Sequence, residues 1–147
     1  MDNVFEKCDI ISVMPDYGGA YLWSKLEGER GIGANIADAW CGYQDWLPIS
    51  ESLQMQFHEW QGQFEKVDFY PCEDEEGNAS DEILNWQGET VDWNWATYHA
   101  EGLRLAKLLK LEVGDQVKVH YVKPYEDFNA VERAMEILLD GTVVILD

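Results

Sequence analysis

Residues 92–122 read DWNWATYHAEGLRLAKLLKLEVGDQVKVHYV, and this stretch contains both kinds of regular structure that the chain needs. Its first part repeats apolar and aromatic side chains, with one histidine among them, at the spacing of one helix face. The members of this stripe are Trp95, His99, Leu103, Ala106 and Leu109. Asp92 is the predicted N-cap, and Gly114-Asp115 is expected to end the helix. His99 is predicted to be a hydrogen-bonded histidine of the core or its edge.

The second part of the stretch alternates in the period of two that marks a half-buried strand. Val117, Val119 and Tyr121 occupy one set of positions, and more polar residues occupy most of the other. Pro124 is expected to end this strand, because proline cannot donate to a sheet ladder.

A further amphipathic helix is predicted to begin after Ser50, which is a good N-cap residue. Leu53, Phe57, Trp60 and Phe64 follow at steps of four, three and four, so they share one face. Glu51 in the first turn is favourable to the helix dipole.

Other strands are indicated at the two ends of the chain. Residues 9–14 are apolar and β-branched and run into the turn-forming residues 15–19. Asp140-Gly141 separates two apolar runs, 136–139 and 142–146, and predicts a hairpin with a type I′ turn. The alternative for residues 131–139 is a helix, because Val131, Ala134, Met135 and Leu138 have helical spacing. Residues 20–23 suit either a short strand or a helical turn. A short helix is expected within 35–46, because Ile36, Trp40 and Tyr43 have helical spacing.

These elements predict one domain over residues 1–147 with an α+β fold. Two main helices are expected to pack on an antiparallel or mixed sheet of about four strands, which ends in a C-terminal β-hairpin. Residues 71–90 are expected to form a long polar loop, and loops of this length inside compact domains tend to be functional or disordered.

The charge of the chain restricts its partners. Twenty-nine acidic residues face ten basic ones, for a net charge of −19. Such a surface repels nucleic-acid phosphates and anionic lipid headgroups, and it attracts basic proteins. We therefore expect no direct binding to nucleic acid or membrane. The simpler interpretation is that the acidity serves solubility.

The densest acidity lies in the predicted loop and is followed by tryptophans. The residues predicted to bind a partner are Glu73, Asp74, Glu75, Glu76, Asp81, Glu82, Trp86 and Trp93. A run of carboxylates on a loop can pair with lysine and arginine in a basic groove, and tryptophan commonly anchors protein interfaces. The alternative is that the run is a solvated loop and that Trp95 and a neighbouring tryptophan belong to the core.

No motif for catalysis, cofactor or metal is present. The glycines of residues 28–33 lack both phosphate-loop and dinucleotide spacing, and His58-Glu59 lacks the second histidine of a zinc protease. We therefore expect neither enzyme activity nor a cofactor. The alternative is a small enzyme or a ligand- or carbohydrate-binding domain with a pocket near Asp16, Tyr17, Tyr21 and Trp23.

The first residues of the chain and its cysteines indicate a cytoplasmic protein. The first residues are acidic and lack the basic and apolar regions of a signal peptide. The three cysteines, Cys8, Cys41 and Cys72, are widely separated, as suits a reducing compartment.

The acidic run 73–82 with Trp86, Trp93 and Trp95, in a small acidic chain without catalytic motifs, resembles the immunity proteins of bacterial toxin–immunity systems, including those of polymorphic toxins and contact-dependent inhibition. Those proteins share no single fold, so the resemblance assigns no role residue by residue. It implies an inhibitor that binds a basic cognate toxin domain, often a nuclease, and blocks its active site or an adjacent surface.

Overall fold

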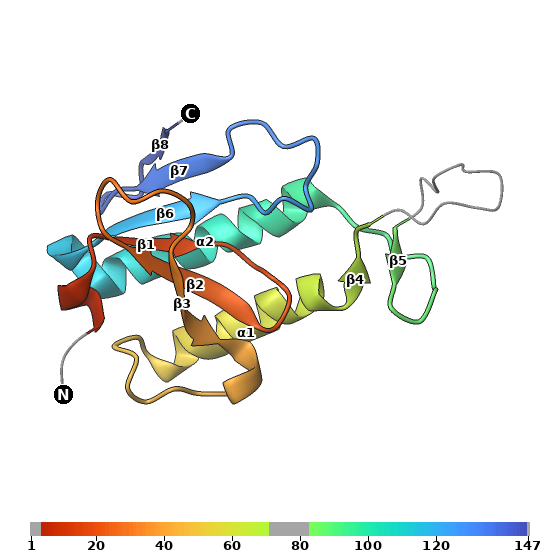
Figure 1. Cartoon of the computed structure of the whole chain (residues 1–147), viewed down its shortest axis with the longest axis horizontal. Helices are drawn as coiled ribbons and strands as arrows, with labels where there is room; N and C mark the ends of the chain where they lie inside the picture. Colours follow the sequence, from red (N-terminus) through yellow and green to blue (C-terminus); the bar gives the residue numbers. More distant parts are fainter. Residues whose placement is uncertain (1–3, 71–82, 147) are drawn as a thin grey trace.

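The computed structural model describes residues 4–70 and 83–146 and shows an α+β architecture (Figure 1). A six-stranded mixed sheet has the order β3-β2-β1-β6-β7-β8, with only the central β1–β6 pair parallel. The strands are β1 (Ile10–Val13), β2 (Ala20–Lys25), β3 (Ala34–Asp38), β6 (Lys118–Val122), β7 (Ala134–Ile137) and β8 (Val143–Ile145). The α+β prediction is confirmed, with six strands in this sheet where about four were expected.

Two helices cover one face of the sheet, α1 (Glu51–Glu65) and α2 (Trp95–Val113). A two-stranded ribbon of β4 (Val67–Asp68) and β5 (Leu84–Asn85) projects beyond the C-terminal end of α1 (Figure 1). The strand β5 lies inside the stretch 71–90 that the sequence indicated as loop. Short 3₁₀ turns occupy Val4–Lys7, Ala39–Cys41 and Gly114–Gln116. No helix of the described residues is long and apolar enough to cross a membrane.

The predicted apolar stripe of α1 forms the centre of the core. Leu53, Phe57, Trp60 and Phe64 are all 2 % exposed or less, and Ser50 accepts a hydrogen bond from the Leu53 amide as the predicted N-cap. On the sheet, the alternation of β6 places Val119 and Tyr121 against the helices. His120 therefore faces the opposite side of the sheet, where no helix packs.

Three local predictions were wrong. Asn94, not Asp92, caps α2, because its side chain accepts from the Thr97 amide at 3.0 Å. Residues 35–46 contain no α-helix, because β3 pairs with β2 and the Asp38 side chain then caps a short 3₁₀ turn. The terminal hairpin forms as expected, but Asp140 does not have positive φ. Instead, Gly141 does (φ 87°), after a turn closed by its amide bonding to the Leu138 carbonyl. This is the three-residue loop with a glycine bulge, not a type I′ turn.

The two helices are joined by a reciprocal pair of hydrogen bonds. Trp60 Nε1 donates to the Tyr98 carbonyl at 3.1 Å, and the Tyr98 hydroxyl donates to the Trp60 carbonyl at 2.8 Å. The two rings stack with centroids 4.7 Å apart. Each aromatic side chain therefore buries its surface and satisfies its polar group in the same contact.

Helix α2 approaches the sheet closely at Gly102. A Cβ atom there would lie 2.5 Å from Tyr121 Cε1 and 2.6 Å from Trp60 Cζ2. Both neighbours are fully buried, so neither has room to move aside. Gly102 does not adopt positive φ, so its backbone conformation does not require glycine. The position requires glycine because there is no room for a side chain.

We predict that Gly102→Ala lowers the free energy of unfolding by about 1–3 kcal/mol through overpacking. Gly62→Ala is the matched control, because a Cβ on this α1 glycine meets nothing within 4 Å. The control is expected to raise stability by about 0.5–1 kcal/mol, since alanine is the better helix former. Urea unfolding of both variants measures the difference, and a Gly102→Ala variant as stable as the control would contradict this account.

Candidate functional site

Exposed aromatic side chains gather at the end of the domain that carries the β4–β5 ribbon. Tyr70, Trp86 and Phe128 are 52 %, 61 % and 56 % exposed. Tyr70 contacts Phe128 edge to face, with ring centroids 6.0 Å apart. Tyr17 contacts Trp86 in the same way at 5.8 Å. Large apolar groups left in solvent near one another are typical of a binding surface.

Carboxylates lie near Tyr70 and Tyr17, and one of them, Glu126, is itself only 7 % exposed. The Tyr70 hydroxyl donates to Glu126 Oε2 at 2.7 Å, and this bond, with the charges of Glu126, Asp16 and Asp68, raises the pKa of Tyr70. Burial is the main cause of the raised pKa of Tyr17, and Glu126 and Asp68 add to it. The tyrosines thus report a negative potential at this end of the molecule.

We call this surface the acidic–aromatic end. It comprises Asp16, Asp68, Tyr70, Trp86, Glu126 and Phe128. Its parts come from the β1–β2 turn, the β4–β5 ribbon and the loop after β6. Trp86 fastens the ribbon to helix α1, because its Nε1 donates to the Glu65 carbonyl at 2.8 Å.

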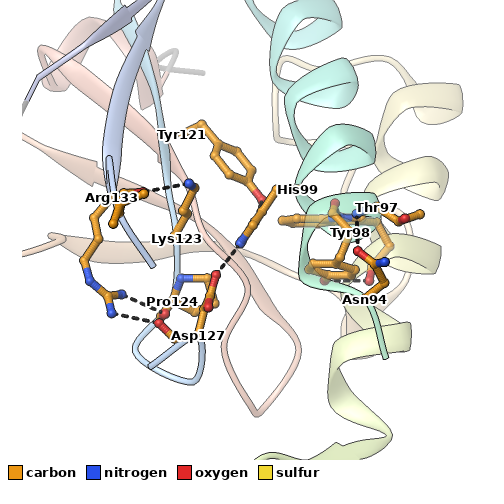
Figure 2. A network of polar contacts seen from close by, with 11 residues as sticks. Asn94, Thr97, Tyr98, His99, Tyr121, Lys123, Pro124, Asp127 and Arg133 are labelled. Carbon is orange, nitrogen blue, oxygen red and sulfur yellow. Dashed lines mark hydrogen bonds and ion pairs between the residues drawn. The ribbon is translucent and has the colours of Figure 1, made fainter. Parts of the chain in front are cut away.

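A buried polar network holds the loop that supplies Glu126 and Phe128. His99 of α2 lies between two partners (Figure 2): its Nε2 is 2.8 Å from Asp127 Oδ2, and its Nδ1 is 2.7 Å from the Tyr121 hydroxyl. Trp95 stacks on the imidazole at 5.2 Å. The prediction that His99 is a hydrogen-bonded histidine of the core is confirmed, since it is 7 % exposed.

The chemistry of its partners determines the protonation of His99. An ionised Asp127 only accepts hydrogen bonds, so Nε2 carries the hydrogen and Nδ1 accepts from the Tyr121 hydroxyl. Burial lowers the pKa of His99, and the Asp127 carboxylate opposes this shift in part. The imidazole is therefore neutral at pH 7, with both nitrogens engaged.

The same loop is tied to itself by two basic side chains. Arg133 donates to the carbonyls of Pro124 and Asp127 at 3.1 and 2.8 Å (Figure 2). Lys123 Nζ donates to the Val131 carbonyl at 2.8 Å. These bonds fix the backbone of residues 123–133 around Asp127. Because Glu126 and Phe128 flank Asp127, the network positions one half of the acidic–aromatic end.

This network resembles a catalytic His–Asp pair only in its residue types. The hydroxyl on the far side of His99 belongs to Tyr121, which is 0 % exposed, and burial raises the pKa of that hydroxyl. A buried, protonated phenol is a poor nucleophile, and it occupies the nitrogen that would act as a base. Within residues 4–70 and 83–146, no group of three His, Cys, Asp or Glu side chains is arranged to hold a metal ion.

The predicted partner-binding residues have different positions. Trp86 is exposed at the acidic–aromatic end, as a binding anchor requires. Trp93 precedes α2 and packs with Phe69, Trp95 and Tyr98, and its enclosed Nε1 has no hydrogen-bond partner within the described part of the chain. Glu73, Asp74, Glu75, Glu76, Asp81 and Glu82 lie outside the described residues.

The alternative pocket near Asp16 consists of side chains that already bond within the protein. The Tyr17 hydroxyl donates to the Val67 carbonyl, and Trp23 Nε1 donates to the Met14 carbonyl. Tyr21 is fully buried, stacks on Phe57 and bonds to His58 Nε2. A ligand among these groups would have to compete with those bonds.

Comparison with known proteins gives no family to assign. No family model matches the chain, and no match was found among curated proteins or solved structures. Functional inference therefore rests on the residues and geometry described above.

We predict that His99 makes stability depend on pH in a defined direction. Its folded pKa lies below the unfolded value near 6.5, so below about pH 6.5 the unfolded chain gains a proton that the folded chain resists. The stabilisation by neutral His99 is therefore complete above that pH and is lost as the pH falls. His99→Gln should cost about 1–3 kcal/mol at pH 8 through its disturbed hydrogen bonds.

That cost should shrink toward pH 5, by at most about 1.4 kcal/mol per pH unit. Leu105→Ala, a fully buried position with no titrating group, is the control whose cost should not vary with pH. Urea unfolding of the three proteins from pH 5 to pH 8 measures both. A His99→Gln cost that grows on acidification would show that the sign is wrong.

Proposed function

We propose that this chain is a non-enzymatic inhibitor that binds a basic partner protein through the acidic–aromatic end, in the manner of a bacterial immunity protein bound to its cognate toxin domain. The observation that carries the proposal is the surface itself. Three large aromatic side chains lie exposed among carboxylates, in a chain of net charge −19. The corresponding compartment would be the cytoplasm, and the partner class would be a nuclease domain.

Each part of the surface suits a different contribution to binding. The carboxylates would attract lysine and arginine side chains and accelerate encounter. Tyr70, Trp86 and Phe128 would supply apolar area at the centre of the contact, where water is excluded. A nuclease binds the phosphates of nucleic acid in a groove lined by basic groups. A surface of carboxylates could occupy that groove, and unlike nucleic acid it would not be cleaved there.

The position of the predicted acidic run agrees with this surface. Residues 71–82 connect Tyr70 to Ile83, so their six carboxylates are covalently joined to the end of the molecule that carries the exposed rings. The run and the acidic–aromatic end would thus present one contact region to a partner. The run itself lies outside the described residues, so the proposal uses it only through its sequence.

We predict that affinity capture from the native cell lysate yields one basic protein in near 1:1 ratio with the tagged chain. The purified partner should cleave nucleic acid, and the chain should stop that cleavage at equimolar concentration. Mass spectrometry identifies the partner, and a nuclease assay measures the inhibition. A partner whose activity the chain leaves intact, or none at low and high salt alike, would overturn the proposal.

We predict that association depends on the charges of this end and not on net charge alone. Asp16→Asn with Asp68→Asn should slow association with that partner by about threefold to tenfold at low salt and flatten its salt dependence. Neutralising residues 73–76 should act in the same direction. Glu51→Gln with Asp115→Asn is the matched control, because it also removes two negative charges. Glu51 begins α1 and Asp115 follows the end of α2, and these are the helix ends that lie away from the acidic–aromatic end.

Stopped-flow mixing measures the association rates. Asparagine retains the oxygen through which Asp16 and Asp68 accept the amides of Tyr17 and Tyr70, so the folds of these turns should persist. Equal slowing in the control pair would show that only total charge matters, and it would remove the acidic–aromatic end from the proposal.

A further inference from the structure

A pocket lies on the face of the sheet that the helices leave uncovered. It encloses about 370 Å³, within the range of small-ligand sites. Its lining comes from β1, β6 and β7, from Lys25 at the end of β2, from the residue after β8, and from two loops that border it, the β2–β3 connection and the loop after β6. In Figure 1 the β2–β3 connection arches over the central strands. None of the six residues of the acidic–aromatic end lines the pocket, although the loop after β6 contributes to both.

The floor of the pocket is apolar with a small polar centre. Met14, Val122, Ala134 and Leu146 supply most of the apolar lining. Ser12 and His120 are register partners on the parallel strands β1 and β6, and both line the pocket. Their side chains project to this face because Val13, Val119 and Tyr121 project to the other.

The charged side chains of the pocket are basic. Lys25 and Lys123 lie on its two bordering sides, and among the described residues neither ammonium group pairs with a carboxylate: Lys25 donates to the Gly31 carbonyl and Lys123 to the Val131 carbonyl. The Arg133 guanidinium at the rim is held by the Pro124 and Asp127 carbonyls. Among the residues that the structure describes, no aspartate or glutamate lines this pocket.

That composition is unusual for this chain, because acids outnumber bases by 29 to 10. A second pocket shows the contrast, since Asp9, Glu27, Asp115 and Glu136 all line it. Positive charge beside an apolar floor favours a ligand with one negative group and an apolar body.

Ser12 places a hydroxyl at the floor of the pocket. The residue is only 1 % exposed and lines the pocket, and its hydroxyl makes no hydrogen bond to the described part of the chain. A hydroxyl at the floor of a pocket without a protein partner is satisfied by a bound acceptor or by water. A carboxylate oxygen is such an acceptor.

We propose that this pocket binds a small amphiphilic carboxylate, with an apolar body of roughly eight carbon atoms, as a pocket of this size can hold. The ammonium groups of Lys25 and Lys123 hold the carboxylate by charge, and Ser12 donates a hydrogen bond to it. Met14, Val122, Ala134 and Leu146 cover the apolar body. This proposal does not depend on the proposed function, because it uses the other face of the sheet and no partner protein.

The test is titration with sodium octanoate, followed by calorimetry and by amide chemical shifts. Acetate, which has no apolar body, and octan-1-ol, which has no charge, are the comparison probes. We expect saturable binding of octanoate, weaker binding of both comparison probes, and shifts centred on Ser12, His120 and Ala134.

Two double variants decide whether the pocket lysines are responsible. Lys25→Gln with Lys123→Gln should weaken octanoate binding by about tenfold or more, since charge-assisted bonds are lost. Lys66→Gln with Lys107→Gln removes two exposed lysines outside the pocket and should leave binding within about twofold.

Three results would overturn the proposal: no saturable binding of octanoate, octan-1-ol binding as tightly as octanoate, or equal weakening in the two double variants. Any of them leaves the capture experiment unaffected, and failure to capture a partner leaves the octanoate titration unaffected. The two proposals can therefore fail separately.

Discussion

The stacked pair of Trp60 and Tyr98 is the contact on which the rest of the fold depends. Each residue donates its polar hydrogen to the main chain of the other, so two helices from different parts of the chain are held in one register. That register places Gly102 against Tyr121 and thereby sets the depth of α2 on the sheet. It also brings His99 within hydrogen-bonding distance of Tyr121 and Asp127. The position of the candidate surface is thus a consequence of packing in the core.

The helices could be predicted because their signals are local. The spacing from Leu53 to Phe64 and the cap at Ser50 require only neighbouring residues, and both were confirmed. Residues 34–38 illustrate the limit of that approach. Ile36 and Trp40 have helical spacing, but Ile36 lies in β3, which pairs with β2, and Trp40 lies in the 3₁₀ turn that follows. A pairing partner cannot be identified from spacing alone. The number of strands in the sheet and their order also depend on pairing between residues that are far apart in the sequence.

The candidate sites likewise combine features that the sequence shows with features that only the fold creates. The acidity and the tryptophan at residue 86 are visible in the sequence, and Trp86 does lie exposed at one end. Glu126 and Asp127 belong to residues 123–127, which the sequence marks as a turn after a strand, a place that can hold a site but is more often only a turn. Their significance comes from the Tyr70 hydroxyl and the His99 ring, which only the fold brings to them. Lys25 and Lys123 are likewise too far apart in sequence to suggest a shared pocket.

The parallel pairing of β1 with β6 has a consequence for how this chain is made. Ile10 pairs with Lys118, so the centre of the sheet joins two strands of which β6 is synthesised much later than β1. Until β6 leaves the ribosome, one edge of β1 has no partner, and an open edge in a nascent chain invites association with other chains. Closing such a long loop also delays folding, because the entropy of loop closure is lost before the distant contact forms. The dense negative charge that precedes β6 in the sequence would keep unfinished chains apart by mutual repulsion during that interval.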